Sequence, residues 1–460
     1  MWTRSAPTIV AAALLAGSVL TGCGLSADAG TTASAEPAAV QSLPGSDAST
    51  ARLGIITERF MAQTGDLPGS FGGFNAEQIS ALTQSLTRVE DRSITVLSTP
   101  ITLGGSVADR PTRDAAMACT EHRGSSIVIT DVADPALIDC LIGNGSIVID
   151  ASAQPWDEAA LIQRAPFLWA TATATADVAE LALLAQAKAA GLLATGPATI
   201  VAGPDRVTQR VAATITSPGL TADGLVPATI TVGEQVTASP TTMQARDAEQ
   251  FSAAVDQARR DGQTGVVRPI APRVFSAMTS SDSFNRVRST ILITSTSWPG
   301  GPLARGTLSS GTAPIGSRTA LLGWSPPSDG TAMVDTPNAA GDAAAAAACQ
   351  STLKTNLPPP GRQGAWASLY RMCDALSLAR TALSAQGAPT AAGVRDTIWN
   401  ASTQWQPAAV TANGWTPNTY TGANIAQWLT WNPSCTLMTK QDPIGCFAPT
   451  GAPIPLQPRG

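Results

Sequence analysis

Seven cysteines carry the most distinctive side-chain chemistry of this 460-residue sequence. Cys23 stands alone near the N-terminus, and the other six follow as three pairs of neighbours along the chain. An even number of thiols favours disulfide bonds, which persist in an oxidising compartment outside the cytosol. Six cysteines allow several pairings, of which sequence neighbours are the natural choice: Cys119–Cys140, Cys349–Cys373 and Cys435–Cys446.

Catalytic and metal-binding side chains are scarce. No C-x-x-C spacing occurs and His122 is the only histidine, which removes most metal, acid–base and triad arrangements. His122 stands near the end of an expected helix, so we expect a solvated histidine or one in the helix's last turn. Asp131 and Asp134 form a carboxylate pair, but Asp134 before Pro135 is typical of a helix cap or turn. We therefore expect no enzyme, no metal site and no cofactor.

The N-terminus has the pattern of an export signal. Arg4 precedes a short apolar run over residues 9–20, and Leu20-Thr21-Gly22-Cys23 follows. The run is shorter than a membrane-spanning helix, and small residues end it. Residues 1–22 are predicted to be a cleaved signal peptide; an ordinary signal peptide or an N-terminal anchor helix is the alternative. The four residues resemble the lipobox of bacterial lipoproteins, which implies diacylglycerol on the Cys23 sulfur and a position on the extracytoplasmic face of the cell membrane.

Composition limits the possible partners. Hydrophobic residues make up 44% of the chain, charged residues 13%, and the formal net charge is −5. Lysines and arginines are scattered, which argues against nucleic acid or anionic lipid headgroups as partners. Residues 23–50 are rich in Ala, Ser, Thr and Gly and predict a flexible tether from the lipidated cysteine. The remainder is long enough for two or three domains.

From residue 51 onward, short β-branched runs alternate with helical periodicity, which predicts two tandem parallel sheets covered on both faces. Strands are expected at 52–57, 93–97, 126–130, 146–150, 198–202, 229–232, 265–267, 290–294 and 319–324, with an extended segment at 167–171. Helices are expected at 76–89, 112–122, 135–142, 176–190, 206–216, 246–261, 343–353, 366–386 and 391–400. From Trp415 on, we expect surface strand and loop.

This order of elements resembles the type I periplasmic-binding fold, and within it the branched-chain amino-acid-binding (leucine-binding) family of ABC-transporter solute receptors, of the actinobacterial type. Residues 167–171 correspond to the family's crossing between lobes. The helix around Tyr370 and Asp374 is similar to the family's Tyr-Asp-Ala helix, and residues 431–435 resemble a Cys-bearing tail. One difference is that Arg206 follows Gly203-Pro204-Asp205 where the family has Asp-Asp-x-Tyr-Gly.

The resemblance implies an α/β protein with two doubly wound parallel-sheet lobes joined by hinge crossovers. The N-terminal lobe is expected to comprise residues 51–169 and about 298–365. The C-terminal lobe is expected to comprise 170–297 and about 366–460, including the disulfide-bearing tail.

Ligands of open parallel sheets bind beyond the carboxyl ends of the strands, and in two-lobed receptors these loops line the cleft between the lobes. In this family's pattern, hydroxyl side chains hold a ligand carboxylate and an acidic residue holds its ammonium. The carboxylate candidates are Thr130, Ser152, Thr171 and Thr173; the ammonium candidates are Glu58 and Asp131; Asp205 and Ser295 end strands of the second lobe. A capping or turn-stabilising role is the alternative for each.

Two functions follow as hypotheses. The first is a monomeric, membrane-anchored receptor that passes a small polar ligand, such as an amino acid or amide, to the permease subunits of an ABC importer. The second is a non-transport cell-envelope lipoprotein that uses the same fold as a sensor or protein scaffold. The missing Asp-x-Tyr-Gly pattern, the two tyrosines of the chain and its Trp/Pro-rich tail motivate the second hypothesis.

Overall fold

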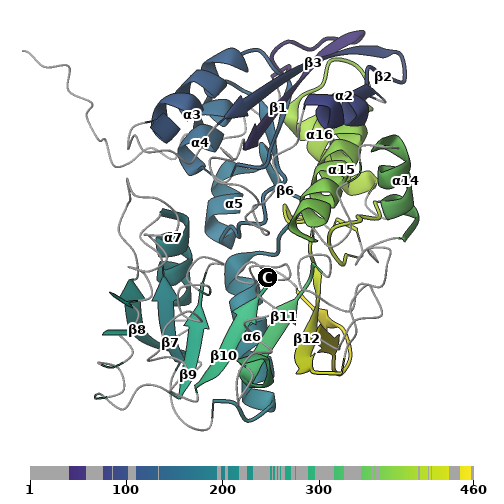
Figure 1. Ribbon diagram of the computed structural model, residues 1–460. Coiled ribbons are helices and arrows are strands. Elements are labelled where there is room, and N and C mark those ends of the chain that lie inside the picture. Colours follow the sequence, from purple (N-terminus) through teal and green to yellow (C-terminus); the bar gives the residue numbers. More distant parts are fainter. Residues whose placement is uncertain are drawn as a thin grey trace, which may run out of the picture.

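A computed structural model shows two lobes, each built on its own β-sheet (Figure 1). It describes residues 41–58, 76–84, 86–101, 110–132, 134–193, 198–202, 206–216, 225–231, 265–270, 289–295, 315–325, 343–353, 363–401, 405–412, 414–415, 417–434 and 446–456, with single positions at 249–250, 252–253, 256, 260, 275 and 357. Cys23, Asp205, Cys435 and most of the helix expected at 246–261 lie outside these ranges.

The first sheet has six strands in the order β2-β3-β1-β4-β5-β6. They are β1 (Thr50–Glu58), β2 (Arg88–Val89), β3 (Arg92–Ile101), β4 (Ile127–Thr130), β5 (Ile147–Asp150) and β6 (Leu168–Ala170). All neighbours pair in parallel except β2 with β3. Every residue of β4 and β5 is buried, because helices cover both faces of the sheet.

Four helices of the first lobe lie between these strands in sequence: α2 (Ala76–Gln84), α3 (Arg110–Glu121), α4 (Pro135–Gly143) and α5 (Glu158–Arg164). Helix α4 begins as expected, since the Asp134 side chain accepts a hydrogen bond from the Ala136 amide at 2.8 Å and Pro135 takes the first helical position. The predicted disulfide Cys119–Cys140 is present and joins α3 to α4.

The second sheet has the order β13-β12-β11-β10-β9-β7-β8, with β14 paired to β12. Its parallel part comprises β7 (Ala198–Ala202), β8 (Leu225–Thr231), β9 (Val266–Pro269), β10 (Thr290–Thr294) and β11 (Thr319–Gly323). Its antiparallel part comprises β12 (Ile425–Asn432), β13 (Cys446–Pro449) and β14 (Ile454–Pro455). Helix α6 (Ala176–Ala189) packs on β10 and β11, and α7 (Arg206–Ile215) packs on β7 and α6.

The chain divides between the lobes differently from the sequence-based prediction. Strand β11, expected in the first lobe, pairs in parallel with β10 of the second sheet. Helix α14 (Ala343–Leu353) packs on α2, and α15 (Gln363–Leu383), expected in the second lobe, packs on β4 and β5. Helix α16 (Ala391–Asn400) packs on α15. The expected boundary near residue 365 is therefore wrong, because apolar faces distant in sequence select these partners.

The C-terminal segment also differs from expectation. The prediction from Trp415 onward was surface strand and loop, but β12 pairs with β11 inside the second sheet and buries Leu429 and Phe447 on β12 and β13. The predicted disulfide Cys349–Cys373 is present and ties α14 to α15. Cys446 begins β13, and its predicted partner Cys435 lies outside the described residues.

The last part of the expected tether belongs to the first lobe. Leu43 is buried, and its amide donates to the Pro389 carbonyl at 2.8 Å. Ser42 forms an isolated β-bridge with Thr390, and Thr50 begins β1. Residues 41–50 are therefore attached to the first lobe through Leu43, Ser42 and Thr50, although most of their side chains are exposed. The composition of residues 23–50 as a whole did not reveal the one buried leucine.

His122 is buried, in contrast to the expected solvated side chain. Its ring Nε2 lies 3.1 Å from Thr99 Oγ1, and Gly54 of β1 leaves room for the ring, since a Cβ atom at Gly54 would lie 2.4 Å from Nδ1. Burial lowers the pKa of His122 to about 4, and the charge of Arg52 lowers it further while Glu121 opposes the shift. His122 is thus a neutral packing residue just after the end of α3.

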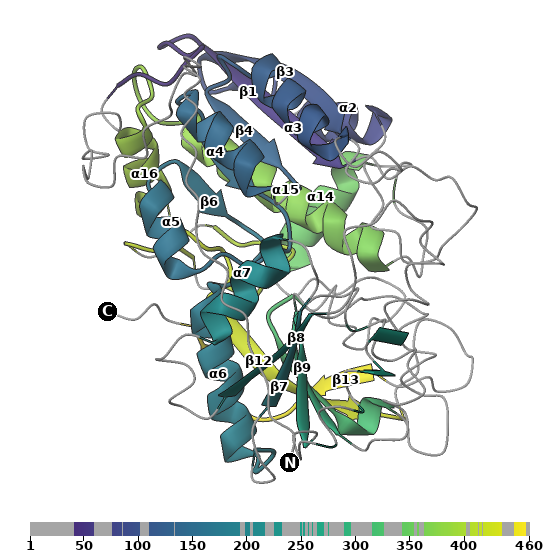
Figure 2. The same ribbon diagram turned by 90° about the vertical axis from the view of Figure 1, so that its left-hand side faces the viewer.

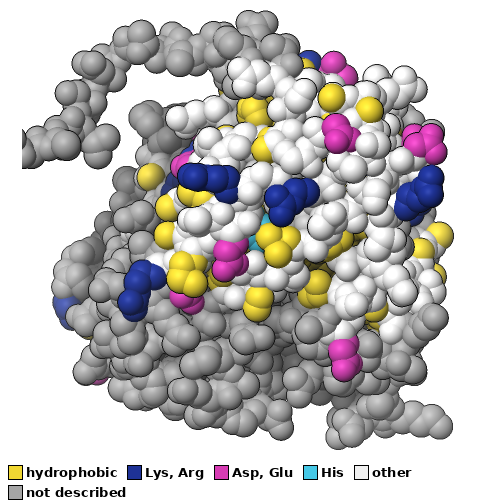
Figure 3. Space-filling model, turned by 90° about the horizontal axis from the view of Figure 1, so that it is seen from above, with side chains coloured by type: hydrophobic (Ala, Val, Ile, Leu, Met, Phe, Trp, Pro, Cys, Tyr) yellow, Lys and Arg dark blue, Asp and Glu magenta, His cyan; other side chains and the backbone are white. Residues whose placement is uncertain are grey.

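Among the described residues, none of the helices combines the length and apolar character needed to cross a bilayer. On the face of the first lobe in Figure 3, basic side chains stand apart from one another among acidic, polar and apolar ones. This view gives no basic patch of the kind that binds nucleic acid.

Candidate functional site

The carboxyl ends of the parallel strands in the two sheets face each other where the lobes meet (Figures 1 and 2). In Figure 1 the arrowhead of β1 points down from the first lobe, and those of β9 and β10 point up from the second. The register brings Ile56, Thr130 and Asp150 level on β1, β4 and β5. Polar side chains that follow these positions therefore gather at one edge.

Asp150, the last residue of β5, is the buried centre of this edge. Its Oδ1 accepts from the Ser152 amide at 2.8 Å, and its Oδ2 accepts from the Trp156 indole Nε1 at 2.6 Å. Burial raises the pKa of Asp150 to about 6, although the Trp156 and Ser152 hydrogen bonds and the charge of Arg210 oppose the shift. We call Asp131, Asp150, Trp156, Arg210 and Arg371 the strand-end cluster.

Arg210 brings the second lobe into this cluster. It lies on α7, and its Nη2 donates to the Pro155 carbonyl of the first lobe at 2.7 Å. Its guanidinium lies 4.3 Å from the centroid of the Trp156 ring, a cation–π distance, and its Nε is 3.7 Å from Asp157 Oδ2. Arg210 therefore ties the loop between β5 and α5 to α7, and the Ala176 amide of α6 adds a bond to the Trp156 carbonyl at 2.7 Å.

Replacing Arg210 with alanine is expected to loosen the contact between the lobes. The charged hydrogen bond and the cation–π contact together contribute about 1–3 kcal/mol at a partly exposed site. We expect faster hydrogen–deuterium exchange in residues 152–157 and a larger radius of gyration in solution scattering. Arg395→Ala is the matched control, because Arg395 stacks on Trp399 within α16 at 5.1 Å and joins no second lobe. Equal behaviour of the two variants would contradict the interlobe role of Arg210.

Arg371 approaches the cluster from α15. The residue is 7% exposed, and its Nη2 donates to Ser368 Oγ at 2.9 Å. Burial lowers the pKa of Arg371 to about 10, while the charges of Asp131 and Asp150 raise it. The guanidinium therefore lies near the carboxyl ends of β4 and β5.

Most hydroxyl groups predicted to bind a ligand are engaged with the backbone. Thr130 Oγ1 accepts from the Val132 amide at 3.0 Å, and Ser152 Oγ accepts from the Gln154 amide at 3.3 Å. Thr171 Oγ1 donates to the Asp150 carbonyl at 3.2 Å, and Thr173 Oγ1 donates to the Ala174 carbonyl at 3.1 Å. These bonds are of the turn-stabilising kind.

The other predicted residues divide between the lobes. Asp131 is half-buried directly after β4, and Glu58 ends β1 in register with Ile101 of the same sheet. Ser295 follows β10 in the second lobe, where its Oγ accepts from the Trp324 amide at 2.8 Å. The first sheet thus brings Glu58, Asp131 and the predicted hydroxyls to one edge, and Ser295 lies on the second sheet.

The chain crosses between the lobes after β6, after β11 and after α16. Asp374 of α15 contacts the third of these crossings, which leads into β12. Its Oδ1 and Oδ2 accept from the amides of Ala408 and Ala409 at 2.7 and 2.8 Å. Burial raises the pKa of Asp374 to about 7, although both amide hydrogen bonds lower it.

The crossings lie side by side. Ala170, which ends β6, pairs with the third crossing through Ala170 N to Tyr420 O and Gly422 N to Ala170 O, both 2.8 Å. Trp324, which begins the crossing after β11, accepts at its carbonyl from the Thr411 amide at 2.9 Å. Trp169 packs against Trp415 and Tyr420, with ring centroids at 5.3 and 4.9 Å. Backbone bonds and aromatic packing therefore join the three connecting segments at one hinge.

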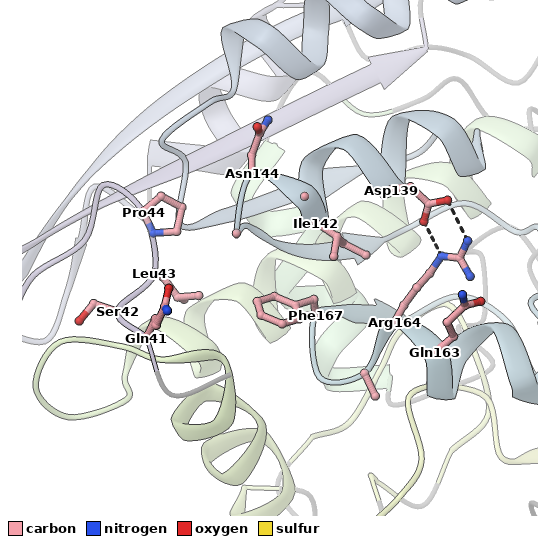
Figure 4. A pocket seen from close by; sticks show the side chains of 13 residues that line it. Gln41, Ser42, Leu43, Pro44, Asp139, Ile142, Asn144, Gln163, Arg164 and Phe167 are labelled. Carbon is pink, nitrogen blue, oxygen red and sulfur yellow. Dashed lines mark hydrogen bonds and ion pairs between the residues drawn. The ribbon is translucent and has the colours of Figure 1, made fainter. Parts of the chain in front are cut away.

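A separate hollow of about 610 Å³ lies at the opposite edge of the first sheet. Its lining includes Pro44, Asn144 and Phe167, which precede β1, β5 and β6 respectively (Figure 4). Arg164 Nε and Nη2 donate to the two carboxylate oxygens of Asp139 at 2.7 and 2.9 Å beside it. Within the described ranges, no group of three His, Cys, Asp or Glu side chains is placed to hold a metal ion.

Sequence reasoning missed Asp150, Trp156, Arg210, Arg371 and Asp374. Asp150 had a signal, because it ends a predicted strand at the edge where ligands bind. The sequence signal for Arg371 and Asp374 as functional residues was weaker: both are charged residues within a largely apolar helical stretch. The contact of Arg210 with Trp156 had none, because it joins two lobes.

No family model matches this sequence, and no curated protein matches it. Solved structures match over most of the chain. One is a solute-binding protein of an ABC transporter from Rhodopseudomonas palustris BisB5 in complex with 3,4-dihydroxybenzoic acid; the TM-score is 0.55 and the identity 11%, over 88% of this chain and 98% of that one.

Two further solved structures show the same arrangement. A type 1 periplasmic binding protein from Bordetella pertussis Tohama I has a TM-score of 0.53 at 12% identity, over 87% of this chain and 100% of that one. A possible leucine/isoleucine/valine-binding protein from Rhodopirellula baltica SH 1 has a TM-score of 0.54 at 11% identity, over 84% of this chain and 94% of that one. The chain therefore has the type I periplasmic-binding fold, as expected from the order of its elements.

Proposed function

We propose that this protein is a membrane-anchored receptor that binds a small polar solute between its lobes and delivers it to an ABC importer. The observation that carries the proposal is the pair of sheets whose carboxyl ends face each other across three hydrogen-bonded crossings. Solutes of open parallel sheets bind at this edge. The charges of the strand-end cluster add polar groups to it, and the solved structures with this fold include a substrate-binding and a solute-binding protein of ABC transporters.

The membrane anchor is the second part of the proposal. The lipid would be attached at Cys23, and residues 24–40 would connect it to the segment, beginning at residue 41, that is attached to the first lobe. A flexible chain of that length has a mean reach of about 20–25 Å. Residues 41–44 lie at the edge of the first sheet opposite the strand-end cluster, so the anchor is attached away from the proposed solute site.

Solute binding is tested on the mature protein with Cys23→Ser to remove the lipid. Differential scanning fluorimetry and calorimetry against amino acids, amides, short peptides, sugars and organic acids are expected to find a solute that raises the melting temperature. A solute at 100 times its Kd stabilises the folded state by about 2.7 kcal/mol. Absence of any stabilising solute, together with no copurified small molecule in native mass spectrometry, would refute the proposal.

A second candidate function is a non-transport envelope sensor or scaffold. One observation favours it: the hydroxyls of Thr130, Ser152, Thr171 and Thr173 are engaged with the backbone. Crosslinking in intact membranes distinguishes the two functions, because the receptor is expected to capture permease subunits and the scaffold other envelope proteins.

A further inference from the structure

Two other buried arginines, Arg92 and Arg268, donate several hydrogen bonds to groups within the fold. Arg92, which begins β3, donates to the carbonyls of Leu383, Ala385 and Gly387. Arg268 of β9 forms a buried ion pair with Glu180 and donates to Thr294 Oγ1. Burying a guanidinium without such partners is costly, so proteins usually supply them.

Arg371 is the exception. Only 7% of its surface is exposed, yet the described residues offer its guanidinium one hydrogen bond, to Ser368 Oγ. Its Nε is buried and has no hydrogen-bond partner among them; Arg92 Nε has none either, so the two arginines differ in the bonds made by their Nη atoms, three for Arg92 and one for Arg371. No carboxylate of the described residues forms a contact ion pair with it.

The surroundings of Arg371 place it where a solute would bind. Asp131 and Asp150 are the charged groups that influence it, and they mark the carboxyl ends of β4 and β5. Each carboxylate oxygen of Asp150 accepts one hydrogen bond, from Trp156 Nε1 or from the Ser152 amide, and the side-chain bond of Arg371 goes to Ser368 instead. Asp150 therefore offers Arg371 charge at a distance without using its hydrogen-bond donors.

We propose that Arg371 binds the carboxylate of the solute, and that this receptor is selective for small carboxylic acids. The proposal rests on the solute-binding function and names its ligand class. A guanidinium presents a planar fork of N–H donors that matches a carboxylate bidentately, and such charge-assisted bonds are stronger than neutral ones. The carboxylate of an acidic solute would be the contact anion for Arg371 that no described residue provides.

The test compares acids with their uncharged amides, using the mature Cys23→Ser protein. Benzoate and benzamide, succinate and succinamide, and phenylacetate and phenylacetamide are matched pairs in which the amide carries no carboxylate. Calorimetry is expected to show binding of at least one acid, with the paired amide bound about 10- to 100-fold more weakly. Arg371→Gln is expected to remove that difference by weakening the acid to a similar extent.

Arg380→Gln is the matched control, because Arg380 is an exposed arginine on the same helix. It is expected to bind the acid as the parent protein does. Without solute, Arg371→Gln is expected to melt at or above the parent temperature, because it removes a buried cation without a partner; a structural role for Arg371 predicts a lower melting temperature.

Each outcome decides whether Arg371 binds the carboxylate of the solute. Equal binding of acids and amides, or unchanged acid affinity in Arg371→Gln, overturns the proposal. If only uncharged solutes bind, the carboxylate proposal fails while the receptor function stands, and if no solute of any class binds, both fail. Should Arg371→Gln not fold, the acid–amide comparison on the parent protein still decides.

Discussion

Replacing Arg268 with methionine is expected to destabilise the second lobe by about 3–5 kcal/mol, because it leaves a buried carboxylate without its partner. Arg268 and Glu180 are both almost fully buried, with side-chain exposures of 1% and 3%. Arg268 Nη2 and Nε lie 2.5 and 3.1 Å from the two carboxylate oxygens of Glu180. The pair joins α6 to β9 in the middle of the second sheet.

The double variant Arg268→Met with Glu180→Met separates the pair's net contribution from the penalty of an unpaired charge. Well-packed apolar residues in place of a buried ion pair are often neutral or stabilising. We therefore expect the double variant to recover most of the stability lost in Arg268→Met. Guanidinium unfolding with a probe in each lobe measures both changes, and additive losses in the double variant would contradict this account.

The second large effect concerns Asp374 and pH. The pKa of Asp374 is raised from 3.8 to about 7 by burial in the folded protein. Its contribution to stability is therefore fully present below the unfolded pKa near 4 and is lost as the pH rises through the folded pKa near 7. A tenfold change in the acid dissociation constant corresponds to about 1.4 kcal/mol, so the loss of folding stability is on the order of 4 kcal/mol across this range.

Asp374→Asn isolates this effect from other titrating groups. Asp150, with a pKa raised to about 6, contributes a loss in the same direction, while His122, with a pKa lowered to about 4, loses stability as the pH falls. Comparison with the variant cancels both. We expect the stability of the parent protein relative to Asp374→Asn to fall by about 3 kcal/mol between pH 5 and pH 8 in urea unfolding, because about two pH units separate pH 5 from the folded pKa near 7.

The same variant probes the hinge, because the two oxygens of Asp374 hold the amides of Ala408 and Ala409 in the third crossing. An asparagine side chain accepts at only one of its two terminal atoms, so one amide loses its partner. Faster hydrogen–deuterium exchange is expected at residues 408–409. A pH-independent difference between the two proteins would show that the carboxylate does not titrate in this range.

Local pattern was sufficient for most secondary structure. The strand expected at 198–202 and the helices expected at 343–353 and 391–400 have those bounds in the structure. Continuous β-branched runs predicted buried parallel strands such as β4 and β5, and their alternation with helices predicted the two-sheet fold. Of the strand-end cluster the sequence named Asp131 and missed Asp150, Arg210 and Arg371; ligand binding at this edge stays a prediction.

The failures share one cause, which is contact between segments distant in sequence. Helix α15 and strand β11 form as expected, but each belongs to the other lobe from the one predicted. Their partners are decided by which surfaces pack together in the folded protein. The segment around Leu43 belongs to the first lobe and not to the expected tether for the same reason, because it bonds to the backbone at Pro389 and Thr390. The hydrophobic pattern of a helix or strand specifies which of its faces is apolar, but it does not specify the element against which that face packs.

The sequence by itself determined most element types, but not strand β2 or helix α5. It also determined the order that predicts two α/β lobes and the neighbouring cysteine pairs that became two disulfides. These follow from local backbone preferences, side-chain period and short loop closure. Only the tertiary structure decided that Arg210 reaches Trp156 across the lobes, that Arg268 is paired while Arg371 is not, and that Asp374 holds the hinge. Pairing and burial of charges depend on which surfaces meet, and that is a property of the folded molecule.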